Sequence, residues 1–129
     1  MSNVSLVIVS HSLDIARGTA DMVRQMAGDS VAVAFCGGRP DGGLGSDPER
    51  ILACIQAVWS EAGVVVMVDL GGAGRSAEMA RERLDPDRQA RVLVCNAALV
   101  EGTVMAATEA SIGGDLHAVC RAALEVGGG

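Results

Sequence analysis

Four short apolar runs rich in valine, each followed by a segment of helical character, constrain the fold of this chain most. They are Val4–Val9, Val31–Cys36, Val64–Asp69 and Arg91–Cys95. Their apolar residues are continuous rather than alternating, which is typical of strands buried on both faces of a parallel sheet. The chain therefore predicts a parallel sheet whose two faces are both covered.

Amphipathic segments with helical periodicity separate the apolar runs. Ser12 or Asp14 can cap the first helix and Gly28 can end it. The predicted helices are Asp14–Met26, a segment from Asp47-Pro48 to near Gly63, a segment after a 70–74 loop to about Leu84 where Pro86 stops it, Leu99–Ile112 and Asp115–Val126. We predict a single domain over residues 1–129. It is α/β and doubly wound, with a mainly parallel sheet in the flavodoxin-like order 2-1-3-4 and helices on both faces.

Composition excludes several classes of function. Half of the 129 residues are apolar, which excludes a disordered chain. The net charge is −6 and all 10 basic residues are arginine, so we predict no nucleic-acid binding. No apolar run approaches the roughly 20 residues of a membrane helix, and the start lacks the pattern of a signal peptide. These features predict a cytoplasmic protein without membrane insertion.

Two polar residues stand where predicted neighbouring strands end. His11 follows the first strand and Asp69 ends the third. In the order 2-1-3-4 these strands are adjacent, and open α/β sheets bind ligands at this edge. A carboxylate that accepts the imidazole Nδ1–H leaves Nε2 as a nucleophile. The pair therefore predicts nucleophilic catalysis by His11 oriented by Asp69, although each residue taken alone also fits an exposed loop histidine or a helix cap.

The backbone around this pair suits phosphate. Ser12 to Asp14 opens one helix and Gly71–Gly74 opens another, and helix N-termini offer unpaired N–H groups to anions. Such a site needs no cluster of basic side chains, in agreement with the acidic composition. The predicted phosphoryl-binding residues are Ser10, Ser12, Gly71, Gly72 and Ser76.

No cofactor and no metal are expected. The chain's two histidines are far apart in sequence, and its four cysteines are scattered and fit reduced core thiols. His117 fits a surface or packing position. Gly72-x-Gly74-x-x-Ala77 fits a dinucleotide fingerprint, but it follows the third strand rather than the first, and no acidic residue ends the next strand.

Several of these segments together resemble a known family. They are Leu6-Val7-Ile8-Val9-Ser10-His11-Ser12, Gly45-Ser46-Asp47, Val68-Asp69-Leu70-Gly71 with Ser76-Ala77-Glu78, and Leu99-Val100-Glu101-Gly102-Thr103. From about Val4 to Val126 the chain resembles the mannose-family enzyme IIA domains of the bacterial phosphotransferase system (PTS). The segment from Leu99 to Gly102 makes it similar to the phosphotransfer subunits of PEP-dependent dihydroxyacetone kinases.

This resemblance implies a reaction and a set of partners. His11 would carry a phosphoryl group on Nε2, with Asp69 in support, in a domain that forms homodimers. The donor would be the phosphocarrier HPr, itself charged by enzyme I from PEP. The acceptor would be ADP on the nucleotide-binding subunit of the kinase, which then phosphorylates dihydroxyacetone.

The chain departs from the family pattern at two places. Some members fuse HPr-like and enzyme I-like domains behind this one, and because this chain ends first we expect separate donor proteins. Gly72, Gly74, Arg75 and Ala98 alter two loops on the rim that would face partners. Two alternatives remain open: an enzyme IIA component of a mannose-type sugar transporter, and a non-catalytic α/β regulatory binding module.

Overall fold

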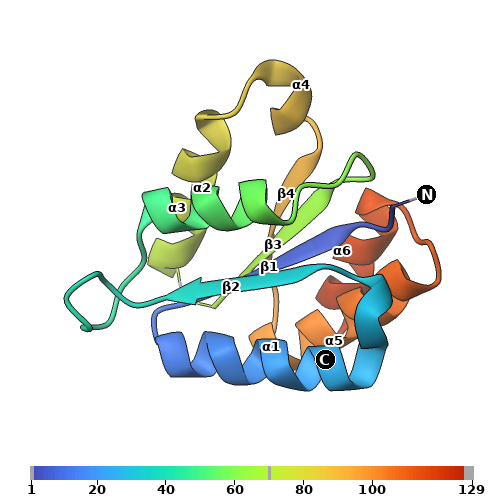
Figure 1. The fold of residues 1–129 in the computed structure, drawn as a ribbon, viewed down its shortest axis with the longest axis horizontal. Helices are drawn as coiled ribbons and strands as arrows, with labels where there is room; N and C mark the ends of the chain where they lie inside the picture. Colours follow the sequence, from blue (N-terminus) through green and yellow to red (C-terminus); the bar gives the residue numbers. More distant parts are fainter. Residues whose placement is uncertain (1, 70, 127–129) are drawn as a thin grey trace.

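The computed structural model describes residues 2–69 and 71–126, and it has the predicted α/β architecture (Figure 1). Its sheet has four parallel strands in the order β2-β1-β3-β4. The strands are β1 (Ser5–Ser10), β2 (Val33–Gly37), β3 (Val64–Val68) and β4 (Val92–Asn96). The predicted strand order is therefore confirmed, and β1 lies between β2 and β3.

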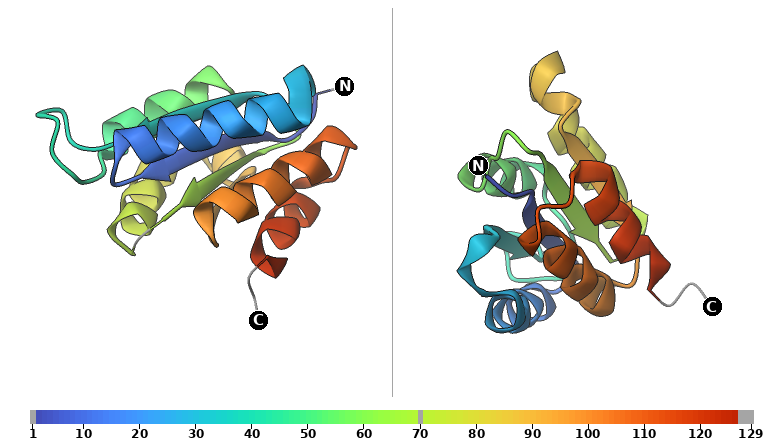
Figure 2. Two further views of the ribbon diagram at one scale, coloured as in Figure 1. Left: turned by 90° about the horizontal axis from the view of Figure 1, so that it is seen from below. Right: turned by 90° about the vertical axis from the view of Figure 1, so that its right-hand side faces the viewer.

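Helices cover both faces of the sheet, as Figure 2 shows. One face carries α1, α5 and α6, and the other carries α2 and α3. Their bounds, together with those of the two short elements, are α1 (Leu13–Ala27), the 3₁₀ helix η1 (Gly28–Ser30), α2 (Pro48–Ala57), α3 (Gly71–Glu82), α4 (Pro86–Gln89), α5 (Leu99–Ser111) and α6 (Leu116–Glu125). Within the described residues, none of these helices has the length and apolar character needed to span a membrane.

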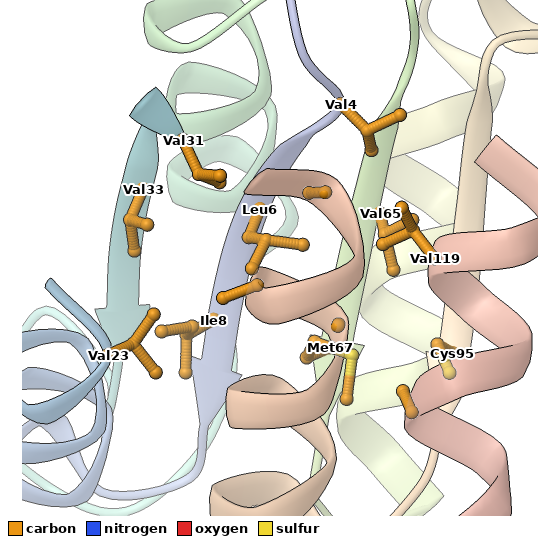
Figure 3. Packing of buried hydrophobic residues seen from close by; sticks show 14 of the residues in the cluster. Val4, Leu6, Ile8, Val23, Val31, Val33, Val65, Met67, Cys95 and Val119 are labelled. Carbon is orange, nitrogen blue, oxygen red and sulfur yellow. The ribbon is translucent and has the colours of Figure 1, made fainter. Parts of the chain in front are cut away.

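Alternation along the strands builds two cores. On β1, Leu6 and Ile8 point to the face covered by α1, α5 and α6, where they meet Met67 of β3 (Figure 3). Val7 and Val9 point to the opposite face and join the cluster under α2 and α3. All these side chains are nearly inaccessible to solvent, which explains why the strands lack an alternating sequence pattern.

Helix caps occur where the sequence predicts them. The Ser12 side chain accepts a hydrogen bond from the Ile15 N–H, and Gly28 ends α1 with a φ of 77°. Asp47 caps α2 in the same way, with Pro48 at the first helical position. These two caps fix the points at which the chain leaves the carboxyl edge of the sheet.

Two predicted boundaries are wrong, and one short helix was not predicted. β2 begins at Val33 rather than at Val31, because the 3₁₀ helix after α1 delays the start of the strand. α2 ends at Ala57 rather than near Gly63; the N–H of Val58 closes the last turn on the Cys54 carbonyl. Pro86 does not merely stop a helix: it opens the short helix α4, which Asp85 caps.

The predicted 70–74 loop is also corrected. α3 begins at Gly71, so the glycines from 71 to 74 form the first turn of a helix, while Leu70 lies outside the described residues. Ala73 and Ala77 of this helix are fully buried against the sheet. Burial of these small side chains overrides the weak helix propensity of glycine.

Candidate active site

His11 and Asp69 meet at the carboxyl edge of the sheet, as the strand order predicts. Val9 of β1 pairs with Val68 of β3. His11 and Asp69 therefore follow the ends of two adjacent strands. The His11 Nδ1 lies 3.0 Å from Asp69 Oδ1. The His11 backbone N–H also donates to Asp69 Oδ2, at 3.0 Å. One carboxylate therefore holds both the main chain and the ring of His11.

This geometry selects one tautomer of the imidazole. An ionised carboxylate only accepts hydrogen bonds, so the ring nitrogen beside it carries the proton. That nitrogen is Nδ1, which leaves the Nε2 lone pair directed away from Asp69. The side chains of His11 and Asp69 are 24% and 18% exposed, so the imidazole is held firmly but remains accessible.

Nε2 faces the start of α3. A Cβ placed on Gly72 would lie 3.5 Å from His11 Nε2 and 4.0 Å from Cε1. The absence of a side chain at Gly72 keeps the space beside His11 Nε2 open. Gly71 and Gly72 begin α3, and the first N–H groups of a helix have no acceptor within the helix itself.

The three serines predicted to bind phosphate have different surroundings. The fully buried Ser10 donates from Oγ to Asp69 Oδ2 at 2.7 Å and accepts from the Ser12 N–H at 3.0 Å. Ser12 lies next to His11 and uses its own hydroxyl as the α1 cap. Ser76, in the second turn of α3, shares a hydrogen bond of 2.7 Å with Ser46.

The glycine-rich segment 37–45 forms a wall on the β2 side of His11. The Gly45 N–H donates to the His11 carbonyl at 3.1 Å. A Cβ on Gly37 would lie 2.7 Å from the Ser10 carbonyl oxygen, so only glycine permits this close approach of two backbone segments. The loop therefore packs directly against the turn that carries the nucleophile.

A cleft of about 440 Å³ separates this wall from the start of α1. Its lining includes His11, Leu44, Arg39 and Arg50. Arg39 forms an ion pair of 2.7 Å with Asp41. The Gly43 N–H, together with Arg39, holds the pKa of Asp41 below its usual value. Sequence reasoning did not single out Arg39 in the loop or Arg50 in α2, because isolated arginines carry no pattern. Ser46 entered only as part of the Gly45-Ser46-Asp47 motif.

The remaining candidates lie away from the site. His117 is exposed on α6, as predicted. In residues 2–69 and 71–126, no three His, Cys, Asp or Glu side chains gather in an arrangement suited to a metal ion. The four cysteines are free. A hydrogen bond to Cys54, with burial, raises the pKa of the Cys36 thiol, and the same bond lowers the pKa of Cys54. Burial, aided by Cys120, raises the pKa of Cys95 to about 12.

Comparisons with known sequences give one consistent family. The EIIA-man family model, described as PTS system fructose IIA component, matches residues 5–120. The phosphoryl donor subunit DhaM of the PEP-dependent dihydroxyacetone kinase of Pantoea ananatis is 41% identical over 94% of this chain. The corresponding subunit of Escherichia coli is 40% identical over 90% of it. The chain spans only 26% and 25% of the length of these two relatives.

A shorter relative matches along nearly its whole length. The phosphoryl donor subunit of PEP-dependent dihydroxyacetone kinase 2 of Listeria innocua is 34% identical, over 90% of this chain and 93% of the relative. Among solved structures, the protein of unknown function EF1359 superimposes with a TM-score of 0.83 at 31% identity, over 97% of this chain and 95% of that one. Part of the dihydroxyacetone kinase of C. freundii, 24% of that chain, shares the fold with a TM-score of 0.63 at 20% identity.

Proposed function

Because this chain belongs to the EIIA-man family of PTS IIA components, we propose that it is a phosphohistidine carrier that receives a phosphoryl group on His11 Nε2. The observation that carries the proposal is the double contact of Asp69 with His11. It fixes the ring with Nδ1 toward the carboxylate and Nε2 toward the open space beside Gly72. An exposed loop histidine without a function needs neither contact.

The transfer step uses only His11, Asp69 and the phosphorylated donor. The Nε2 lone pair attacks the phosphorus, the new N–P bond forms, and the bond from phosphorus to the donor's nitrogen breaks, with its electron pair returning to the donor. His11 keeps its Nδ1 proton, so the ring becomes cationic as the bond forms. Asp69 stabilises that developing charge at 3.0 Å. Passing the phosphoryl group to an acceptor oxygen reverses these changes.

The phosphoryl oxygens would be bound by the backbone at the edge of the sheet. We assign this role to the N–H groups of Gly71 and Gly72 at the start of α3, with the Ser12 and Ser76 hydroxyls within the same rim. Backbone donors at a helix start suit a dianionic group and need no lysine, and the chain has none. Neither a cofactor nor a metal enters this step.

The named relatives indicate the partners. All seven are phosphoryl donor or phosphotransferase subunits of dihydroxyacetone kinases. We therefore propose that the chain acts as a phosphotransferase component in the cytoplasm, with HPr as donor and ADP on the nucleotide-binding kinase subunit as acceptor. These names favour the kinase over a mannose-type sugar transporter. A homodimer is also proposed, as the resemblance to the mannose-family enzyme IIA domains implies.

The test is the intact mass of the protein after incubation with PEP, enzyme I and HPr. We expect one acid-labile phosphoryl group on the wild type and on His117→Ala, and none on His11→Ala. The His117 variant is the matched control because it removes the other histidine of the chain. Adding the nucleotide-binding kinase subunit with ADP should then move the group to ATP.

Two outcomes would overturn the proposal. Label on His11→Ala would place the phosphoryl group on another residue. A wild type that stays unmodified with HPr of several bacterial sources, each shown to be phosphorylated, would favour the binding module. Transfer to a membrane sugar permease, with none to the kinase subunit, would retain the carrier chemistry but assign it to the transporter.

A further inference from the structure

We propose that Ser10 is a positioning residue that orients Asp69, and through it His11, rather than a direct ligand of the phosphoryl group. This inference rests on the proposed function for its catalytic consequence. Its structural part, the control of the His11 tautomer, is independent of phosphorylation and can be measured on the unmodified protein.

The hydroxyl of Ser10 is fully used inside the site. Its single hydrogen is donated to Asp69 Oδ2 at 2.7 Å, and its oxygen accepts the Ser12 N–H at 3.0 Å. Phosphoryl oxygens are acceptors and would need that same hydrogen. Ser10 is also 0% exposed at the end of β1, so no group on a partner protein can reach it.

The contact helps to fix one carboxylate oxygen of Asp69. Asp69 Oδ2 accepts from the Ser10 hydroxyl and from the His11 N–H, while Oδ1 faces the His11 Nδ1. A carboxylate held at one oxygen by two donors cannot rotate freely about its last side-chain bond. The direction of Oδ1 toward Nδ1 is therefore fixed before any partner arrives.

Ser10 also connects the pair to α1. By accepting the Ser12 N–H, it ties the residue that caps α1 to the carboxylate that orients the ring. A buried hydroxyl is costly unless it is hydrogen-bonded, and here both of its bonds serve the turn that carries His11. Loss of the hydroxyl leaves the Ser12 N–H and Asp69 Oδ2 each short of one partner.

The same strand offers a matched control. Ser5 starts β1 and is 2% exposed, but it lies at the opposite end of the strand from His11. Ser5→Ala removes a buried hydroxyl from the same strand without touching the site. A general effect of such a loss on the sheet appears in both variants, whereas an effect on Asp69 appears only in Ser10→Ala.

The experiment measures the His11 ring nitrogens by ¹⁵N NMR and the rate of phosphoryl uptake from phospho-HPr. The Nδ1–H tautomer should dominate in the wild type and in Ser5→Ala. In Ser10→Ala we expect a mixture with the Nε2–H form and an uptake rate lower by about 10- to 100-fold. Ser10→Thr keeps a hydroxyl. It should recover most of the Nδ1–H tautomer and most of the uptake rate, provided that its amide spectrum matches the wild type.

The outcomes separate the two proposals. A folded Ser10→Ala protein with the wild-type tautomer and the wild-type uptake rate would overturn the positioning role. An equal loss in Ser5→Ala would assign the effect to the strand. If the wild type accepts no phosphoryl group, the proposed function fails, while the tautomer measurement still decides the role of Ser10.

Discussion

Gly72 sets the space beside His11 Nε2, the proposed nucleophile, so filling that space should block the proposed phosphoryl carriage without harming the fold. A Cβ at this position would lie 3.5 Å from His11 Nε2, which is ordinary contact with the free ring. A longer side chain extends from there into the volume that a group bound to Nε2 must occupy. The change is mild for the helix, because leucine has a higher helix propensity than glycine.

We therefore expect Gly72→Leu to fold at least as stably as the wild type but to accept phosphate slowly. Misplacing a reacting group by about 1 Å costs roughly 100-fold in rate, so a loss of at least that size is predicted. The uptake rate of Gly72→Ala should fall between those of the wild type and Gly72→Leu, because its methyl group only reaches contact distance from Nε2. The assay is the initial rate of phosphoryl uptake from phospho-HPr, with thermal unfolding measured in parallel.

Gly18→Leu is the control for this series. Gly18 is an exposed helical glycine of α1, and a Cβ there would meet nothing within 4 Å. It should accept phosphate at the wild-type rate. If Gly72→Leu does so as well, Nε2 does not react in the space beside α3, and the orientation assigned to the ring is refuted.

Four further outcomes follow from the geometry. Asp69→Asn should slow phosphoryl uptake by about 10²- to 10⁴-fold, because the amide cannot stabilise the cationic ring; a wild-type rate in the same uptake assay would exclude its assigned role. Gly18→Ala should raise the free energy of unfolding by about 0.5–1 kcal/mol in urea titration, through helix propensity alone, and no gain would contradict the open surroundings. Gly37→Ala should lower the free energy of unfolding by about 1–3 kcal/mol and also slow phosphoryl uptake, because its Cβ meets the backbone of the β1–α1 turn. Iodoacetamide at pH 8 should modify Cys54, whose pKa is lowered, before Cys95, whose pKa of about 12 keeps it a thiol, and peptide mass spectrometry reads the order.

The sequence was sufficient to predict the sheet and the central pair for a physical reason. Strands buried on both faces must be apolar throughout, so the four runs stand out and their order limits the topology. Once β1 and β3 are neighbours, the residues that end them must be close. The contact between His11 and Asp69 therefore follows from two strand ends and one topological rule.

Other parts of the site depend on packing that has no local pattern. The hydrogen bond between Ser46 and Ser76 joins the segment before α2 to α3, across 30 positions of sequence. The start of α3 at Gly71 was missed because glycines usually mark loops, whereas burial of Ala73 decides the conformation here. Likewise, the sequence places Ser10 beside the site but does not show which way its hydroxyl points.

The acidic, lysine-free composition and the proposed phosphate chemistry are compatible because the site relies on fixed dipoles and one carboxylate. Backbone N–H groups at the start of α3 provide positive potential at short range, where it acts on a group bound to Nε2. Asp69 contributes the opposite charge, placed on the far side of the ring, where it favours a cationic imidazole without approaching the phosphate oxygens. The ring thus separates the carboxylate from the anion that it would carry. Because the strands hold both parts in place, the free protein already has the arrangement that the proposed transfer requires, and a donor would have only to bring its phosphorus to Nε2.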